Sequence, residues 1–258
     1  MAAIIPIPAL RDNYIWVVRE GRNAIVVDPG DAAPVLAWLS HEGVALKGIL
    51  ITHHHGDHVG GVAALTARHP VPVYGPAHES IPGRTHPVVE GDIVALPDVG
   101  LELSVLDVPG HTAGQVAYFG RCDGLPVAFT GDTLFTAGCG RIFEGTPAQM
   151  LASLSKLAAL PGDTLVYCGH EYTLANLRFA LAVEPGNPAL LARQAREQAK
   201  RDLNLPTVPA RMDEERATNP FLRAAEPDVF AAAAAHAGRP LADVVDSFAT
   251  LREWKNGF

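Results

Sequence analysis

Apolar and β-branched residues occur along the first two thirds of the chain in short runs, each followed by Gly, Pro or Asp. This pattern is typical of strands that end in loops. A first strand is predicted within residues 1–14, and further strands are predicted at 14–18, 23–27, 47–53, 71–74, 101–108, 125–131 and 163–168. Helices are predicted between them at 32–41, 59–68 and 146–160, the last with Thr146 as N-cap and Pro147 in its first turn.

After residue 173 the pattern changes to that of helices. A helix is predicted over 188–203, with one apolar face formed by Leu191, Ala195, Ala199 and Leu203. Residues 205–221 are interrupted by proline and too polar for a buried helix, and further helices follow near the C-terminus. We therefore expect a mixed α/β domain at 1–173 and an α-helical domain at 174–258.

The composition is that of a soluble globular protein with a sizeable core, because 48% of the 258 residues are apolar and 19% are charged. No apolar run is long enough to span a membrane. The net charge is −8, and all of it lies before residue 174, where 9 basic residues face 17 acidic ones. A domain with this excess of acidic residues is poorly suited to binding the phosphate backbone of nucleic acids. We therefore expect no nucleic-acid partner.

The first residues do not resemble a signal peptide, because they lack a basic start and contain Pro6, Pro8, Arg11 and Asp12. The three cysteines, Cys122, Cys139 and Cys168, are too few and too irregularly spaced for a disulfide framework or a metal-binding motif. We interpret them as small core residues or inert thiols. Together these features favour a cytoplasmic protein, and we expect a monomer.

The stretch "THHHGDH" at 52–58 carries the strongest chemical signal. In an extended segment alternate side chains point the same way, so His53 and His55 face one side while His54 faces the other. Gly56 permits a sharp turn, after which Asp57 and His58 begin a helix and point differently again. Two pairs of ligands suggest two metal ions, with His54 taking no part.

Three more predicted strands end in a residue of the ligand type: His111, Asp132 and His170. Sites in α/β sheets assemble where strands end and loops begin, so we expect these residues to join the histidine motif. A single histidine in such a place is usually a hydrogen-bonded surface or core residue. That is our interpretation of His41, His69, His78, His86 and His236.

Ligands of this kind, nitrogen and oxygen without sulfur, suit two divalent ions, most simply zinc, with iron or manganese as alternatives. Asp132 stands between two sets of histidines and is the natural bridge between the ions. Two such ions, two carboxylates and a hydroxide leave a net charge of about +1, which favours an anionic or polarised acyl substrate.

The motifs "THHHGDHVGG", "PGHTAGQVAY", "TGDTLF" and "CGHEYT" resemble those of the metallo-β-lactamase fold. Within that fold the chain resembles glyoxalase II, the hydroxyacylglutathione hydrolases. This closer resemblance rests on "PALRDNY", "AGCGRIFEGTPAQM", "GHEYTLANLRFA", "VEPGN", "PTVP", "NPFLR" and the terminal "LREWKNGF". It extends over essentially the whole chain.

The resemblance implies an αββα sandwich with a C-terminal helical domain over the site. It assigns one metal to His53, His55 and His111 and the other to Asp57, His58 and His170, with Asp132 bridging. It also implies that Tyr172, Arg252, Lys255 and the loop Arg141–Phe143 hold glutathione. Animal members of the family have Lys and Tyr at the positions of Arg141 and Phe143, and a phenylalanine cannot donate a phenolic hydrogen bond.

The expected reaction is hydrolysis of a glutathione thioester, S-D-lactoylglutathione, to glutathione and D-lactate. This is the second step of methylglyoxal detoxification, with a metal-bridging hydroxide attacking the carbonyl. Asp57 and Asp132 take part as metal ligands, and no separate nucleophile is apparent in the sequence. The alternatives are a β-lactamase, a persulfide dioxygenase, a lactonase or a tRNA-processing nuclease of the same fold. An alternative that is not an enzyme is a non-catalytic metal-binding module.

Overall fold

The computed structural model describes residues 2–258, and its first half is built around a six-stranded sheet. The strands follow one another in chain order: β1 (Ala3–Ala9), β2 (Asn13–Glu20), β3 (Asn23–Val27), β4 (Ala45–Leu50), β5 (Val73–Pro76) and β6 (His86–Val88). The first three pair antiparallel, and the pairs from β3 to β6 are parallel. The predicted first strand is confirmed as β1.

A second six-stranded sheet is formed by later parts of the chain. Its strands, in spatial order, are β14 (Ala210–Arg211), β13 (Leu165–Cys168), β10 (Leu125–Gly131), β9 (Val116–Cys122), β8 (Leu101–Asp107) and β7 (Ile93–Leu96). Both β8 and β10 pair antiparallel with β9, and β13 is parallel to β10. Therefore β8, β10 and β13 run in one direction, and their carboxyl ends lie at one edge of the sheet.

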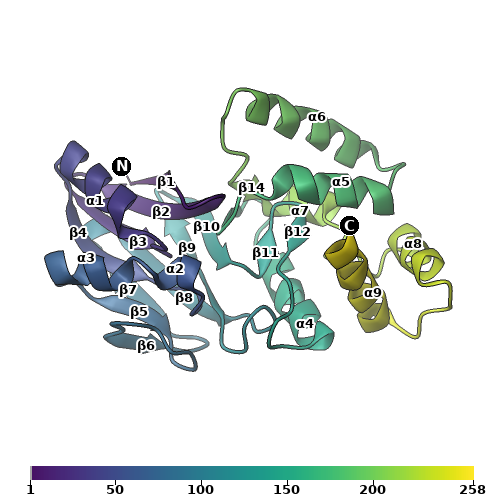
Figure 1. Ribbon diagram of the computed structural model, residues 1–258, viewed down its shortest axis with the longest axis horizontal. Coiled ribbons are helices and arrows are strands. Elements are labelled where there is room, and N and C mark those ends of the chain that lie inside the picture. Colours follow the sequence, from purple (N-terminus) through teal and green to yellow (C-terminus); the bar gives the residue numbers. More distant parts are fainter. Residues whose placement is uncertain (1) are drawn as a thin grey trace.

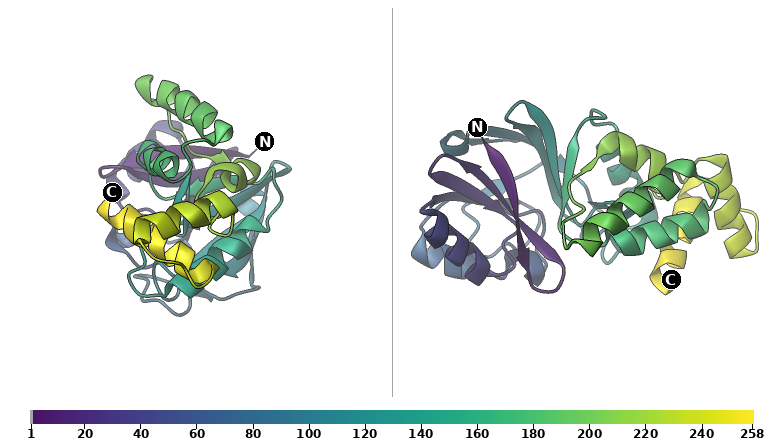
Figure 2. Two further views of the ribbon diagram at one scale, coloured as in Figure 1. Left: turned by 90° about the vertical axis from the view of Figure 1, so that its right-hand side faces the viewer. Right: turned by 90° about the horizontal axis from the view of Figure 1, so that it is seen from above.

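The two sheets pack face to face because their strands alternate between two apolar faces. Trp16 and Val18 of β2 point between the sheets, where they join Leu103 and Val105 of β8 in one core cluster. Ile15 and Val17 point the other way. Their side of the first sheet is covered by α1 (Ala32–Glu42) and α3 (Val62–Arg68), and the outer side of the second by α4 (Pro147–Ala158) and the C-terminal helices. Figures 1 and 2 show these layers, which confirm the predicted αββα sandwich.

The predicted helix at 59–68 is wrong in one respect, because it is broken into α2 (Gly56–Val59) and α3. Gly60 and Gly61 lie between them against the turn that follows β3. A Cβ atom on Gly61 would come within 2.6 Å of the carbonyl oxygen of Pro29. The close approach of these two backbones therefore interrupts the helix. The helix at 147–158 begins as predicted, with Thr146 and Gln149 forming a capping box.

The C-terminal part is helical, as predicted. It contains α5 (Thr173–Val183), α6 (Pro188–Asp202), α7 (Met212–Thr218), α8 (Pro227–Ala237) and α9 (Val244–Gly257). The helix α7 lies in the segment that we expected to be non-helical, and Met212 anchors it in the core. Strand β14 immediately before it returns to the second sheet. The division at residue 173 stays a prediction.

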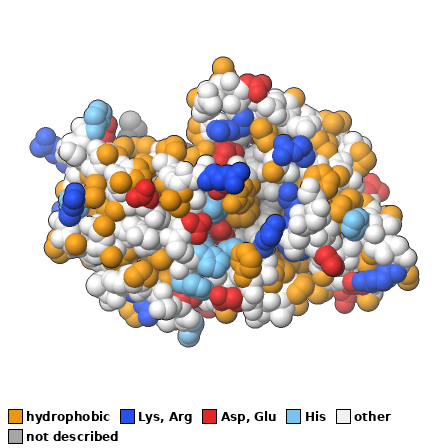
Figure 3. Space-filling view, in the orientation of Figure 1, with side chains coloured by type: hydrophobic (Ala, Val, Ile, Leu, Met, Phe, Trp, Pro, Cys, Tyr) orange, Lys and Arg blue, Asp and Glu red, His pale blue; other side chains and the backbone are white. Residues whose placement is uncertain are grey.

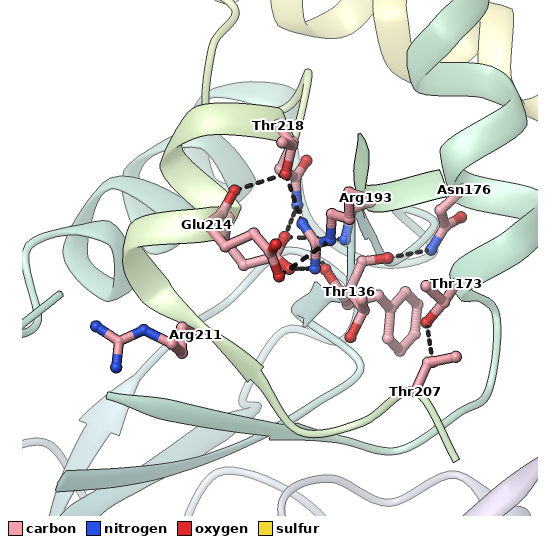
Figure 4. Close-up of polar contacts among 12 residues, drawn as sticks. Thr136, Thr173, Asn176, Arg193, Thr207, Arg211, Glu214 and Thr218 are labelled. Atoms are coloured by element: carbon pink, nitrogen blue, oxygen red, sulfur yellow. Dashed lines mark hydrogen bonds and ion pairs between the residues drawn. The ribbon is translucent and has the colours of Figure 1, made fainter. Parts of the chain in front are cut away.

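The predicted apolar face of α6 is also wrong. Leu191 and Leu203 are exposed, and the helix packs through Leu190, Arg193 and Glu197 instead. Arg193 donates hydrogen bonds to Thr218 and Glu215 of α7. Figure 4 shows the contact between Arg193 and Thr218. The neighbouring helix presents carboxylates rather than apolar groups, so the polar side of α6 faces inward. Figure 1 shows α6 at the outer edge of the helical part.

Among residues 2–258, no helix is long and apolar enough to cross a membrane.

Candidate metal centre

The seven predicted ligands come together at one edge of the sandwich, where strands from both sheets end. His53 and His55 follow β4, and Asp57 and His58 lie in α2. The other three follow strands of the second sheet: His111 comes after β8, Asp132 after β10 and His170 after β13. Figure 3 shows histidine and acidic side chains gathered near the middle of one face, with lysine and arginine on the side of the helical part.

Three histidines form the first half of the cluster. His55 Nδ1 lies 3.2 Å from His53 Nε2 and 3.0 Å from His111 Nε2. His53 and His111 are buried, and His55 is partly exposed. The three ring nitrogens therefore converge on one point that opens to the surface on the His55 side.

An aspartate and two histidines form the second half. Asp57 Oδ2 lies 3.6 Å from His58 Nε2 and 3.4 Å from His170 Nε2. His58 is 1% exposed, whereas Asp57 is partly exposed. Asn13 holds the aspartate by donating from Nδ2 to Asp57 Oδ2 over 3.1 Å. This half likewise presents three ligand atoms to one point.

Asp132 lies between the two halves. Its Oδ1 atom is 3.4 Å from His58 Nε2, and its Oδ2 atom is 3.5 Å from His111 Nε2 and 3.3 Å from His170 Nε2. One carboxylate thus touches ligands of both groups. Gly169, whose Cβ would come within 2.6 Å of Asp132 Oδ1, leaves room for this approach.

The spacing of these atoms fits metal ligation. Bonds of about 2.0–2.2 Å to a tetrahedral ion separate neighbouring ligand atoms by roughly 3.3–3.6 Å, and most of the distances above lie near that range. His58 Nε2 and Asp132 Oδ1 are buried and have no hydrogen-bond partner among the described residues. Such atoms are costly to bury unless something else satisfies them. The His/Asp clusters are therefore suited to binding metal ions.

Four of the histidines are held from behind through the ring nitrogen that faces away from the cluster. His53 Nδ1 lies 3.0 Å from Thr52 Oγ1, and His111 Nδ1 lies 2.8 Å from the carbonyl oxygen of Arg141. The remaining pairs are His58 Nδ1 with Asp28 Oδ2 at 3.1 Å and His170 Nδ1 with Asp12 Oδ1 at 2.8 Å. Contacts of this kind orient imidazole ligands.

Sequence reasoning did not identify Thr52, Asp28 or Asp12 as functional. Asp28 had a usable signal, since it directly follows β3, the strand beside β4 in the same sheet. Asp12 lies in the turn between β1 and β2, and nothing in the local pattern relates it to His170.

Burial and charge perturb the pKa values in the cluster in opposite ways. Burial holds the pKa of His53 well below its usual value, and the neighbouring His58 adds to the effect. Burial alone would also lower the pKa of His58, but the carboxylates of Asp132 and Asp28 raise it well above the usual value. For Asp132, burial is outweighed by His58 and His170, so its pKa is well below the usual value. The cluster thus holds an ionised Asp132 carboxylate between a histidine whose pKa is lowered, His53, and one whose pKa is raised, His58.

His54 is turned away from both groups. Its Nδ1 atom lies 3.0 Å from Glu79 Oε2, and its Nε2 atom lies 3.3 Å from Glu144 Oε1. The alternation of side chains in an extended segment accounts for this direction.

The cluster opens into a cavity of about 510 Å³, whose opposite wall is formed by the end of α9. Arg252 and Lys255 lie three positions apart on that helix and both line the cavity. Arg252 Nη1 donates to the carbonyl oxygen of Cys139 over 2.7 Å, and Lys255 Nζ donates to that of Ala175 over 3.3 Å. Burial, together with the charges of Arg252, Arg178 and Arg141, lowers the pKa of Lys255 to about 8.

Three more predicted residues line the same cavity. Tyr172 stacks on His170, with ring centroids 4.7 Å apart and 5° between the planes. The Phe143 ring is 62% exposed and stands edge-on to His111 at 5.2 Å. Arg141 is exposed on the same loop. The structure therefore brings together all the residues predicted from the sequence, the ligand types on one side and the cations on the other.

Comparison with known proteins agrees with this architecture. Residues 9–170 match the family model of the metallo-beta-lactamase superfamily, and residues 171–258 match that of the hydroxyacylglutathione hydrolase C-terminus. Among solved structures, ETHE1 from Myxococcus xanthus superposes with a TM-score of 0.66 at 25% identity, covering 98% of this chain and 90% of that one. The BLEG-1 B3 metallo-beta-lactamase has a TM-score of 0.64 at 23% identity, covering 85% and 99%. The chain thus belongs to the metallo-β-lactamase superfamily and has its fold.

Curated relatives narrow the assignment. A hydroxyacylglutathione hydrolase of Nitrosomonas eutropha is 52% identical, with all of both chains covered. A protein of the same name from Cupriavidus taiwanensis is 58% identical, again over the full length of both. The chain belongs to the hydroxyacylglutathione hydrolase family, and the predicted resemblance is confirmed.

Proposed function

We propose that the chain hydrolyses S-(2-hydroxyacyl)glutathione thioesters, with S-D-lactoylglutathione as the preferred substrate and glutathione and D-lactate as products. This reaction is the second step of methylglyoxal detoxification. The observation that carries the proposal is the shared cavity of about 510 Å³, in which the His/Asp cluster faces Arg252 and Lys255. The full-length relatives of the same family name support it.

The ligand set divides between two ions. His53, His55 and His111 would hold one, and Asp57, His58 and His170 the other, with Asp132 contacting both. Zinc is the preferred metal for such nitrogen and oxygen donors, and iron or manganese are the alternatives that the same donors accept. When bound, two such ions supply Lewis acidity and lower the pKa of a nearby water to the neutral range.

The chain's own residues bind and orient the substrate. Arg252 and Lys255 supply two positive charges for the glycine carboxylate of glutathione, a pairing that charge-assisted hydrogen bonds make strong. Arg252 is only 6% exposed, and its bond to the Cys139 carbonyl fixes its direction. The glutathione moiety of the thioester is thereby held at the α9 side of the cavity, and the acyl carbon lies on the side of the histidines.

Charge also favours the encounter. The first 173 residues carry the whole negative charge of the chain, but the cavity is bordered by Arg141, Arg252 and Lys255. A local cationic rim attracts an anionic thioester and makes the association rate sensitive to salt.

The three cysteines are buried and form no disulfide, in keeping with a reducing compartment. A cytoplasmic location and a monomeric state stay predictions.

Initial rates for a panel of thioesters, measured beside elemental analysis of the purified protein, test the proposed function. We expect about two metal ions per chain and much faster hydrolysis of S-D-lactoylglutathione than of a lactoyl thioester lacking the glycine carboxylate. The variant Lys255→Met should raise KM for the first substrate with little effect on the second. Stoichiometric metal without hydrolysis of any thioester would instead indicate a non-catalytic metal-binding module.

A further inference from the structure

Glu79 is a buried carboxylate outside the ligand set, and it contacts both loops that carry the three-histidine half of the cluster. It precedes β6 in the first sheet, and its side chain is 3% exposed. Its Oε2 atom accepts a hydrogen bond from the backbone N–H of His54 over 2.6 Å, between the ligands His53 and His55. The same oxygen lies 3.0 Å from His54 Nδ1.

The other oxygen of Glu79 reaches the loop after β8. Oε1 accepts from the backbone N–H of Gly114 over 3.1 Å and from the hydroxyl of Thr112, the residue that follows His111. Gly114 packs directly on this side chain, since a Cβ there would come within 2.8 Å of Glu79 Cγ. One carboxylate therefore joins two chain segments more than fifty residues apart in sequence.

His54 extends the same connection on the outside. While its Nδ1 faces Glu79, its Nε2 lies 3.3 Å from Glu144 Oε1, and Glu144 Oε2 accepts from the backbone N–H of Ala113 over 2.8 Å. The histidine that binds no metal in our assignment thus lies between two carboxylates, and each of them is bonded to residues 112–114.

We infer that Glu79 is the positioning residue of the three-histidine site and that His54 assists it. Its two oxygens hold the His53–His55 segment and the His111 loop at the separation at which the three ring nitrogens converge. A buried carboxylate that accepts several hydrogen bonds is strongly held in place, so it resists the separation of these loops. The inference rests on the metal assignment under the proposed function.

The variant Glu79→Gln tests this role. Glutamine keeps the size of the side chain but offers only one acceptor oxygen, so one of the two backbone N–H groups must face an amide NH₂. Metal release from the purified holoprotein to a chelating dye should show one ion leaving about 10- to 100-fold faster than in the unsubstituted protein, because contacts behind the ligands affect metal binding by that factor. The second ion should leave at its original rate.

The matched control is Glu184→Gln. Glu184 is also a buried carboxylate, bonded twice to Arg223 in the helical part, and it contacts no residue of the cluster. Both ions should leave this variant at the original rates. Equal acceleration of both ions in Glu79→Gln, or no acceleration, would overturn the inference.

A second variant covers the case in which Glu79→Gln does not fold. His54→Ala removes only the side-chain contacts and leaves Glu79 bonded to both backbones, so the same single phase should accelerate by a smaller factor of about 2 to 5. Unchanged release from His54→Ala would then overturn the inference. If the unsubstituted protein itself binds fewer than two ions, the metal assignment of the proposed function fails instead.

Discussion

Two buried groups of charged and polar side chains differ in how their charges are compensated. In the helical part, Arg193 is 1% exposed and is bonded to Thr218 and Glu215, while its Nε atom has no hydrogen-bond partner among residues 2–258 but lies 3.4 Å from Glu214 Oε2. The other oxygen of Glu215 accepts from Asn219 and from the backbone N–H of Ala137. Figure 4 shows Arg193, Thr218 and Glu214 in this part of the molecule. In the His/Asp cluster, by contrast, five ring nitrogens and two carboxylates converge, and His58 Nε2 and Asp132 Oδ1 have no hydrogen-bond partner among residues 2–258.

The difference separates a structural network from a binding site. In a buried ion pair the opposite charges compensate each other without a ligand, whereas a cluster of imidazoles and carboxylates with no Lys or Arg among them is suited to a cation. The two regions are nevertheless connected. Glu215 and Asn219 hold the hairpin of β11 (Leu134–Phe135) and β12 (Gly138–Cys139), which leads from Asp132 to Arg141. The helical network therefore supports one ligand and one edge of the substrate cavity.

The largest effect should come from the cluster. Asp132→Ala removes the carboxylate common to both halves, so we expect loss of at least one metal ion and a fall of at least about a thousandfold in thioester hydrolysis. Elemental analysis and initial rates measure these changes, and circular dichroism should show an intact fold. Asp213→Ala, which removes an exposed aspartate of α7, should have neither effect. Full activity in Asp132→Ala would contradict the metal assignment.

The helical network should respond in stability rather than in metal content. Arg193→Met leaves Glu215 buried without its cation, and breaking one side of such a pair costs about 3–5 kcal/mol of unfolding free energy. Denaturant unfolding measures the loss, and the metal content per folded chain should stay unchanged. The double variant Arg193→Met/Glu215→Gln should recover part of the loss, because no uncompensated charge remains. A drop in bound metal without a drop in the unfolding free energy would contradict the structural role that we assign to the Arg193 network.

The substrate cations predict a pH effect of intermediate size. A lysine is charged below its pKa, so with a pKa of about 8 Lys255 attracts the glutathione carboxylate at neutral pH and loses this attraction as the pH rises through 8. We expect kcat/KM for S-D-lactoylglutathione to fall by roughly tenfold across this range while kcat changes less. Lys255→Arg, which stays charged, should remove the fall. A decline of equal size in that variant would assign the titration to another group.

The smallest effect should come from the exposed ring near the three-histidine site. Phe143→Tyr adds a phenolic hydroxyl at the cavity edge, where the side chain is 62% exposed. One solvent-exposed hydrogen bond contributes about 0.5–1 kcal/mol, so KM for the glutathione thioester should fall by roughly two- to fivefold with kcat unchanged. Steady-state kinetics measure this difference, and Phe143→Leu serves as the control without a hydroxyl. An unchanged KM in Phe143→Tyr would indicate that this ring does not reach glutathione.

Local sequence determined the positions of the candidate ligands. His53, His111, Asp132 and His170 each follow a strand whose apolar run is readable without a structure, and strands that run in one direction end at one edge. The alternation of an extended segment was likewise enough to separate His54 from its neighbours. The spacing of Arg252 and Lys255 on one helix face is equally local.

Only the tertiary structure decided what each of these residues meets. The four-residue repeat in α6 predicted a buried face through Leu191, but the face that met α7 was the one with Arg193, because carboxylates from a distant segment lay there. Glu79 and Asp12 carry no local signal, since their partners are loops far away in the chain. Periodicity records which side of an element is apolar, whereas the contacts of a buried polar group depend on which other segments the fold brings beside it.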